Sequence, residues 1–371
     1  MTRAFLSALL TGTAISLAPI LTAKADETPR VVATIPPLAA IAADIMAGVG
    51  EPDLLIDSGG SPHAYTLRPS DASELAAADY VLWIGEDLEL FLADKLDNLA
   101  PNATLLTAVE LPGVALKEFR TPHDHSSHGG GHDEHGHKDH DDHAHSDHHD
   151  HDHGHDDHDH GDHEKHADHE DHHGDHHDDH GHDDHGHGHD DHHGHNHTGT
   201  DPHIWMAPDN AVAIARGLAD ALSKDLPEAQ AARVRSNLAN FQDDVATLTT
   251  EITENLAPYA EVPFLTFHDA YQYFEATFPL NYHGSITVSP EVQPGAASLR
   301  ALREEISEHG IKCIFSEPQF EPRAIRVVAE NLPVRTGMID PLGDDSINRI
   351  GGYQAFMTNL AEGYADCLGS E

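Results

Sequence analysis

Basic residues are scarce in this chain of 371 residues. Lysine and arginine together number 20, against 65 aspartates and glutamates, and the formal net charge is −45. A surface this acidic repels the phosphates of nucleic acids and of anionic lipids. We therefore expect neither as a partner, and we expect the chain to attract divalent cations instead.

Long hydrophobic runs are absent after the first 25 residues. Residues 1–25 are typical of a cleaved secretory signal peptide, in which Arg3 precedes an apolar stretch and Ala23-Lys24-Ala25 supplies a small-x-small cleavage site. The stretch is short and is interrupted by polar residues and a proline, which favours cleavage over a membrane anchor. No cysteine near this point could carry a lipid. We expect a monomer that is free in the periplasm, with no stable membrane insertion.

Cysteine occurs only twice, at Cys313 and Cys367. In an oxidising compartment such a pair is most simply a disulfide. Closing a loop of about 54 residues would contribute roughly 4 kcal/mol to stability in the chain-entropy model. The alternative is a pair of thiolate metal ligands, but neither cysteine lies in a CxxC-type cluster.

Histidine, in contrast, is abundant. All but five of the 37 histidines lie in residues 123–197, where they are mixed with aspartate and glycine. The tract has no apolar periodicity, so it cannot bury enough surface to offset the entropy lost on ordering. Neutral imidazole suits Zn²⁺, Ni²⁺ and Cu²⁺, whereas an inert polar loop would have no need of histidine. We interpret residues 121–200 as a disordered His/Asp-rich insert with accessory weak metal sites, represented by His149, His151, His153, His173 and His177.

Short apolar segments alternate with helical segments on both sides of the insert. This alternation, with short turns, indicates parallel sheets covered by helices. In the first half we expect strands at 30–35, 53–56, 80–84 and 103–107, and helices at 38–47, 70–77, 88–96 and 210–224. In the second half we expect strands at 263–266, 280–287, 311–316 and 334–339, and helices ending near 277 and spanning 296–307, 323–331 and 353–367.

One long helix is predicted between the two halves. Its apolar positions recur every three or four residues, at Val234, Leu238, Phe241, Val245, Leu248, Ile252 and Leu256. Asp225 and Glu228 have the spacing of a capping box at its start, and Pro258 ends it. A helix of about 32 residues spans roughly 48 Å, which exceeds one small lobe.

The fold class that follows is α/β, with two parallel-sheet lobes joined by one long rigid helix. We place the N-terminal lobe at 26–224, including the insert, the linking helix at 225–258 and the C-terminal lobe at 259–371.

Three of the five histidines outside the insert occupy similar positions in this scheme. His63 follows the second strand, His203 directly precedes a helix, and His268 follows the first strand of the second half. In open α/β sheets, ligands bind in loops at the carboxyl ends of the strands. We therefore weigh a tetrahedral zinc site of three imidazoles against three unrelated polar loop residues. His283 and His309 lie on a strand and at a helix end, where histidine is ordinary.

The chain resembles the zinc receptors of bacterial ABC importers, a family of two α/β lobes bridged by a rigid helix with the metal in the cleft between them. The resemblance covers nearly all of the chain after the signal peptide. The motifs that carry it are SPHAYTLRPSD, DPHIWMAP, TFHDAYQYFE, VSPEVQPGAASL, IFSEPQF, MIDPLG and YADCL.

The resemblance implies that His63, His203 and His268 are zinc ligands and that Cys313 and Cys367 form a disulfide. Some zinc receptors have glutamate directly before the first histidine, but here Pro62 occupies that position. Manganese relatives have glutamate at the third ligand position, so His268 favours zinc, since carboxylate-rich sites suit manganese. Asp340 matches the position of a fourth ligand; it would ligate, accept hydrogen bonds or be replaced by water.

The function that the resemblance implies is high-affinity capture of Zn²⁺ and its delivery to an ABC permease with its ATPase, with a periplasmic zinc chaperone as a possible further partner. Affinity should fall as the pH drops through about 6.5, because the imidazoles must be deprotonated. One alternative is a zinc buffer or chaperone that meets no permease. Another is a secreted zinc hydrolase, but the sequence lacks an HExxH motif that would place a general base beside the metal. We expect a transport receptor and no enzyme.

Overall fold

A computed structural model describes residues 28–57, 59–120, 199–287 and 289–369. The predicted signal peptide, residues 121–198 of the predicted insert and all five of its representative histidines lie outside the described residues. Among the helices of the described residues, none combines the length and the apolar character needed to cross a membrane.

The first lobe contains a parallel four-stranded sheet in the order β2-β1-β3-β4. Its central strands carry an unbroken run of buried residues, which is typical of a sheet covered on both faces. The strands are β1 (Val31–Ala33), β2 (Asp53–Leu54), β3 (Tyr80–Trp83) and β4 (Thr104–Thr107). The helices that accompany them are α1 (Pro36–Ile45), α2 (Pro69–Ala76) and α3 (Leu96–Leu99).

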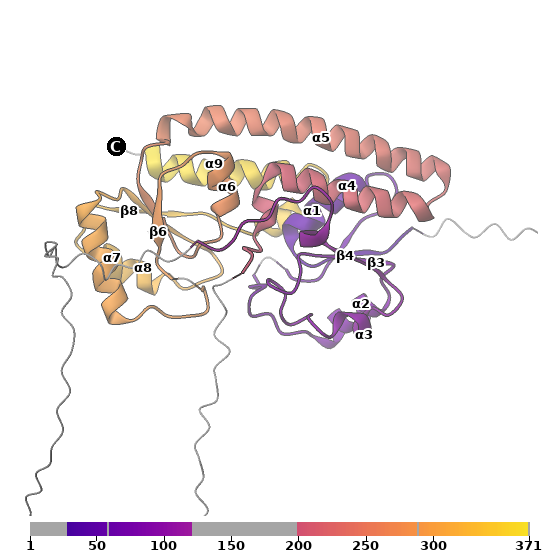
Figure 1. Cartoon of the computed structure of the whole chain (residues 1–371), viewed down its shortest axis with the longest axis horizontal. Coiled ribbons are helices and arrows are strands. Elements are labelled where there is room, and N and C mark those ends of the chain that lie inside the picture. The colour runs from indigo at the N-terminus through magenta and orange to yellow at the C-terminus, as the bar shows by residue number, and fades with distance from the viewer. Residues whose placement is uncertain (1–27, 58, 121–198, 288, 370–371) are drawn as a thin grey trace, which may run out of the picture. The chain divides into compact units, whose positions relative to one another are not determined.

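The second lobe repeats this arrangement. Its four strands are also parallel, and their order β6-β5-β7-β8 reproduces that of the first sheet. Figure 1 shows strands of the first sheet in purple and strands of the second in orange to yellow. The strands are β5 (Phe264–Thr266), β6 (Tyr282–Ser285), β7 (Cys313–Ser316) and β8 (Arg335–Met338). The helices are α6 (Gln272–Thr277), α7 (Ala296–Glu308) and α8 (Arg323–Ala329). The prediction of two parallel-sheet lobes is confirmed.

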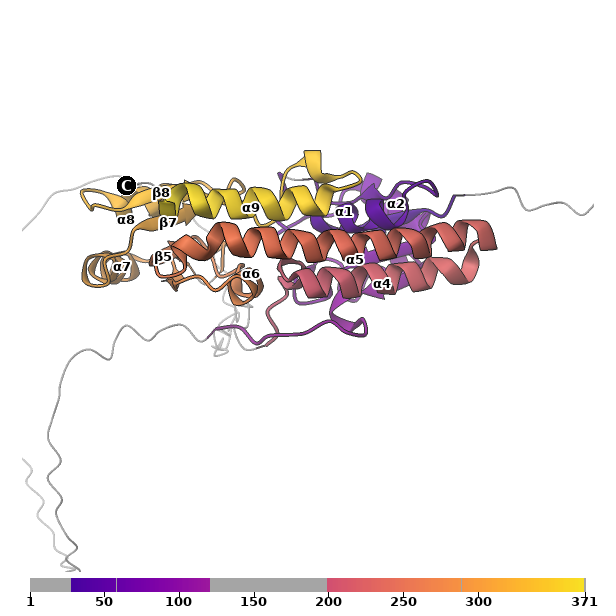
Figure 2. The same ribbon diagram turned by 90° about the horizontal axis from the view of Figure 1, so that it is seen from above.

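Three longer helices pack alongside one another. They are α4 (Pro208–Asp225), α5 (Glu228–Leu256) and α9 (Gly352–Gly369). With 29 residues, α5 is about 44 Å long and packs between α4 and α9 (Figure 2). Six of its seven predicted core positions are buried, and the seventh, Leu238, is partly buried against the same core.

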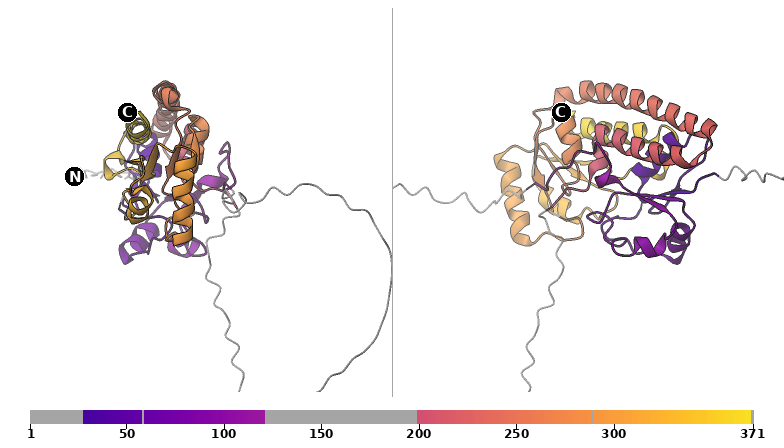
Figure 3. Two further views of the ribbon diagram at one scale, coloured as in Figure 1. Left: turned by 90° about the vertical axis from the view of Figure 1, so that its left-hand side faces the viewer. Right: turned by 45° about the vertical axis from the view of Figure 1, so that its right-hand side comes forward.

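The lobes share one hydrophobic core. A single cluster of buried side chains includes residues of the first sheet, of α5 and α9, and of one face of the second sheet. The helix α9 contacts both α1 in the first lobe and β8 in the second, and α5 extends over both lobes (Figure 3). Wide opening of the lobes would break this core, so we expect movements of loops rather than a hinge closure.

Two local predictions were wrong. The segment predicted as a helix at 88–96 forms turns, and only Leu96–Leu99 is helical. The buried carboxylate of Glu89 accepts the N–H groups of Ile84 and Gly85, and Asp94 has a φ of +55°, which a helix cannot accommodate.

The predicted cap of α5 was the second. Asp225 is the last residue of α4 and accepts a hydrogen bond from the Tyr80 hydroxyl. The N-cap residue of α5 is Pro227. The helix α2 starts at Pro69, and Asp71 accepts the N–H of Arg68 from inside the first turn.

Cys313 in β7 and Cys367 in α9 form a disulfide, with their Cα atoms 6.1 Å apart. The predicted pairing is confirmed. Because α9 also packs on α1 and α5, the bond ties the second sheet to the helix layer that both lobes share.

Replacing both cysteines by alanine should lower the free energy of unfolding by about 2–4 kcal/mol, because the unfolded chain regains the entropy of a long closed loop. Chemical denaturation of the oxidised protein and the double variant measures the difference. Equal midpoints and slopes would contradict this role of the disulfide.

Asp44 provides a pH-dependent contact between α1 and the segment before α9. Its Oδ1 accepts the N–H of Gly351 at 2.7 Å. Burial raises the pKa of Asp44 to about 6, a hydrogen bond from Gly351 lowers it, and the charge of Asp244 raises it. The folded state therefore binds this proton more tightly than the unfolded state, and the ionised carboxylate costs stability above pH 6.

Asp44→Asn, which keeps an oxygen for Gly351, should raise the free energy of unfolding at pH 7 by about 1–2 kcal/mol. The gain should shrink as the pH falls through about 6 and vanish below about pH 4, where the carboxyl is protonated in both states. Unfolding curves between pH 4 and 8 test this, and a difference that does not change with pH would contradict it.

Candidate metal centre

His63, His203 and His268 come together although 205 positions separate the first from the last. His63 lies in the loop between β2 and α2, and His268 in the loop after β5. His203 directly precedes a short 3-10 helix, Ile204–Met206, that leads into α4. His203 and His268 are buried, and His63 is half-buried. The parallel sheets thus deliver two of the three at strand carboxyl ends, as expected for this fold class.

The spacing of the three imidazoles suits one metal ion. One ring nitrogen from each histidine lies within 4.8 Å of the other two. The Nε2 atoms of His63 and His203 are 3.3 Å apart. A tetrahedral Zn²⁺ with Zn–N bonds of 2.0–2.1 Å holds its nitrogens about 3.3 Å apart, so this pair already has the required separation.

Two buried carboxylates orient the buried imidazoles. The Nδ1 of His203 lies 2.8 Å from Oδ1 of Asp201, and the Nδ1 of His268 lies 2.7 Å from Oε1 of Glu317. A carboxylate at Nδ1 keeps the proton there and leaves the lone pair of Nε2 for a metal. Burial works to lower the pKa of His268, but the charge and hydrogen bond of Glu317 outweigh it and raise that pKa.

Among the described residues, Nε2 of His268 is buried and has no hydrogen-bond partner. A buried polar nitrogen without a partner is costly, and a bound cation would satisfy it. The donor set and this orphaned nitrogen both fit a divalent metal.

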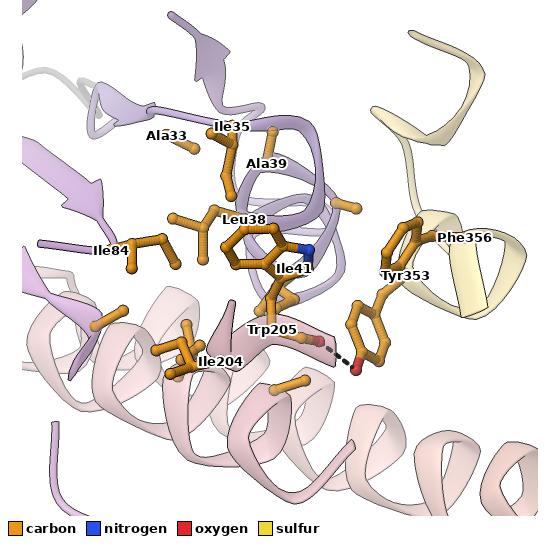
Figure 4. Close-up of a cluster of buried hydrophobic side chains, with 14 of the residues drawn as sticks. Ala33, Ile35, Leu38, Ala39, Ile41, Ile84, Ile204, Trp205, Tyr353 and Phe356 are labelled. Carbon is orange, nitrogen blue, oxygen red and sulfur yellow. Dashed lines mark hydrogen bonds between the residues drawn. The ribbon is translucent and has the colours of Figure 1, made fainter. Parts of the chain in front are cut away.

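Trp205 anchors the His203 segment in the shared core. Its indole is fully buried between α1 and the start of α9, beside Leu38, Ile41 and Tyr353 (Figure 4). The indole N–H donates to the carbonyl of Pro341, and the Trp205 carbonyl accepts the hydroxyl of Tyr353 at 3.0 Å. Because these partners come from the second lobe's sequence, the His203 segment of the first lobe is held from both sides.

The three imidazoles line a small pocket with room for about one water-sized ligand beside them. Both lobes contribute to its lining, which comprises Ser61, Pro62, His63, His203, Trp205, His268, Gln319, Phe320, Pro341 and Leu342. No carboxylate is among these residues, so water is the simplest fourth ligand.

Residues 31–367 match the family model described as "ZnuA: Zinc-uptake complex component A periplasmic". The chain is 37% identical to the high-affinity zinc uptake system protein ZnuA of Brucella abortus (strain 2308), with 93% of each chain covered. It is 35% identical to the protein of that name from Paracoccus denitrificans, again with 93% of each covered. The chain belongs to the ZnuA family.

Solved structures share the fold at lower identity. A ZnuA deletion mutant with zinc bound superposes with a TM-score of 0.65 at 18% identity, covering 93% of this chain and all of that one. The periplasmic zinc-binding protein TroA from Treponema pallidum gives 0.64 at 16% identity, covering 92% and 99%. The binding protein FpvC of Pseudomonas aeruginosa, solved with Mn²⁺, gives 0.63 at 17% identity, covering 92% and 99%. The fold of the ZnuA family therefore does not by itself determine the metal.

Asp340 is not part of the histidine cluster. Its Oδ1 accepts hydrogen bonds from Nε2 of Gln319 at 2.7 Å and from the N–H of Leu342 at 3.0 Å. Burial raises its pKa, against those hydrogen bonds. Of the roles that the sequence left open for Asp340, the structure shows that of a hydrogen-bond acceptor, which shapes the loop at one wall of the pocket.

His283 and His309 also lie outside the cluster. Their rings are 5.4 Å apart, and His309 caps the C-terminal end of α7 within 4.0 Å of Glu305. Sequence reasoning missed the parts that Asp201 and Glu317 play. The signal for Asp201 was its position two residues before His203, which also lets its Oδ1 accept the His203 N–H at 3.0 Å.

Glu317→Gln should weaken the binding of Zn²⁺ or Co²⁺ about tenfold, because the amide no longer supplies the charge that holds the proton on Nδ1 of His268. Competition with a chromophoric chelator measures the affinity. The matched control is Glu321→Gln, an exposed carboxylate on the same loop. Equal affinities for the two variants would contradict this role of Glu317.

Proposed function

We propose that this chain is the periplasmic receptor of a bacterial zinc importer, which captures Zn²⁺ between its lobes and delivers it to an ABC permease driven by an ATPase. The observation that carries the proposal is the cluster of three imidazoles, in which one ring nitrogen of each lies within 4.8 Å of the other two. One pair is already at the 3.3 Å that a tetrahedral zinc ion requires, and two of the imidazoles are held by carboxylates. Zinc is the cargo here, and His63, His203 and His268 are its ligands.

Selectivity for zinc follows from the ligand types. Three imidazoles in a pocket whose described lining has no carboxylate suit Zn²⁺, an ion of intermediate softness, whereas Mn²⁺ prefers carboxylate and water oxygens. The two nearby carboxylates are engaged with Nδ1 atoms, so turning either toward the metal would release a histidine from its orientation. Water completes the tetrahedron, and Asp340 supports the pocket wall.

Delivery requires that the ion be reached without unfolding the receptor. The half-buried His63 lies in a loop, whereas His203 and His268 are buried and bonded to carboxylates. Because α5, α9 and the shared core hold the lobes together, we infer that the permease opens the site by displacing the loop that carries His63.

The insert has a separate role in this proposal. Its histidines, including His149, His151, His153, His173 and His177, form several weaker sites that collect zinc near the main site or report its abundance. Each such site must be ordered when it captures an ion, and the entropy lost lowers its affinity. A periplasmic zinc chaperone is a further candidate partner.

A zinc buffer without a permease would use the same site and differs only in its partner. Membership of a family described as part of a zinc-uptake complex favours the importer. For a hydrolase, a general base would have to stand beside the metal-bound water. The described lining of the pocket offers none besides the imidazoles, which favours a receptor over an enzyme.

Deletion of residues 123–197 should remove several weak zinc sites and leave one tight site. His203→Ala in the full chain should instead weaken the tight site at least a hundredfold and leave the weak sites unchanged. Competitive zinc titration of the three proteins measures both classes of site. Loss of the tight site in the deletion variant would contradict the assignment of that site to the cluster of His63, His203 and His268.

The importer is distinguished from the buffer by its partner. Bacterial cells that lack this protein should take up radioactive zinc poorly at nanomolar supply, and the wild-type chain, but not the His203→Ala variant, should restore uptake. Equal restoration by both proteins would contradict delivery from this site.

A further inference from the structure

The two ends of the insert are paired where they leave the lobes. Residues 117–120 and 199–201, here called the insert base, form an antiparallel bridge between Glu118 and Thr200. The N–H of Phe119 donates to the carbonyl of Gly199 at 3.0 Å, and the N–H of Asp201 donates to that of Lys117 at 2.8 Å. Backbone hydrogen bonds therefore join the two strands of the base.

The helix α6 of the second lobe holds the insert base. Nε2 of Gln272 donates to the carbonyl of Glu118 at 3.0 Å and to Oδ2 of Asp201 at 3.1 Å. The hydroxyl of Tyr273 accepts the N–H of Lys117 at 2.8 Å and donates to the carbonyl of Asp201 at 2.9 Å. Two adjacent side chains of α6 thus contact both strands of the base.

Arg120 adds a charged anchor. Its guanidinium pairs with Glu275 at 2.5 Å and with Asp269 at 3.3 Å, and it stacks over the ring of Tyr282 at 3.9 Å. Glu275 lies on α6 and is buried, so removing Arg120 would leave a buried carboxylate without its cation. Arg120 therefore adds a charged contact to the neutral hydrogen bonds between the base and the second lobe.

Asp201 connects this attachment to the zinc site. Its Oδ1 holds Nδ1 of His203, while its Oδ2 accepts the hydrogen bond from Gln272. Both oxygens are therefore engaged, and the plane of the carboxylate is fixed from the second lobe. The helix that carries Gln272 starts only four residues after His268, so the same short segment supplies one ligand and orients another.

We propose that α6 positions His203 for zinc through the insert base, with Gln272 as the positioning residue. This inference rests on the proposed function, in which His203 is a zinc ligand. Gln272 prevents rotation of the Asp201 carboxylate, and Asp201 in turn keeps Nε2 of His203 directed at the position shared with His63 and His268. Without Gln272, Asp201 retains its bond to His203 but loses its fixed plane, and the ligand geometry loosens.

Gln272→Met tests the proposal in the full chain, because it keeps the length of the side chain and removes the donor. Zinc affinity, measured by chelator competition below one equivalent of metal, should fall about tenfold. The visible absorption of bound Co²⁺ should lose intensity as the tetrahedral geometry relaxes. Gln272→Leu should behave in the same way, since Gln272 is partly exposed and neither variant disrupts the core.

Thr277→Val is the matched control, because the Thr277 hydroxyl bonds only to the backbone of its own helix at Tyr273. It should leave affinity and the Co²⁺ spectrum unchanged. In a His203→Ala background, Gln272→Met should cause no further loss, since it acts through a ligand that is already absent.

If the Gln272→Met protein binds zinc as tightly as the wild type, the inference is overturned and the proposed function stands. The same holds if Gln272→Met still causes a tenfold loss in the His203→Ala background. If the His203→Ala protein itself binds zinc as tightly as the wild type, the proposed function is overturned, and the inference with it.

Discussion

Two buried hydrogen bonds between carboxylates and imidazoles are the constraint on which the site depends. An imidazole has two nitrogens, and a metal site works only if the correct one carries the lone pair. Asp201 and Glu317 settle this for His203 and His268 by holding the proton on Nδ1. Burying a carboxylate costs several kcal/mol unless it is well paired, so the surrounding structure must supply those partners accurately. The shared core, Trp205 and the contacts of α6 all serve this requirement.

The fold positions these carboxylates and imidazoles with two sheets of the same strand order and a layer of helices common to both. The sheets bring loops to their carboxyl ends, where His63, His268 and Glu317 lie. The buried faces of α5 and α9 belong to one continuous core, so we expect the distance between the lobes to change little. A preformed pocket of this kind loses little entropy on binding, which favours a high affinity. Release of a bound ion from such a pocket must then come from movements of loops.

Most of the fold and the three histidines of the candidate site could be predicted from the sequence. Strands such as 80–84 are short, continuous apolar runs, and α5 has an unbroken helical periodicity, so local pattern sufficed. The three histidines of the candidate site were singled out by their places beside strand and helix ends and by the motifs around them, and the structure brings them together. The turns at 85–95 were missed because Glu89, a charged residue, is buried and bonded to backbone N–H groups, which no local pattern reveals. The roles of Glu317 and Gln272 depend on contacts with residues 49 and 71 positions away, and only the folded chain brings those together.

The His/Asp-rich insert dominates the composition, yet the site is built from three histidines outside it. What the structure adds is the place of attachment: the insert leaves the lobes from a base that also holds Asp201 and, through it, His203. Anomalous diffraction at the zinc edge from crystals with less than one equivalent of zinc tests the central claim most directly. The strongest peak should lie about 2.0–2.1 Å from Nε2 of His63, His203 and His268. A strongest peak elsewhere, or bound through Nδ1 of His203 or His268, would contradict it.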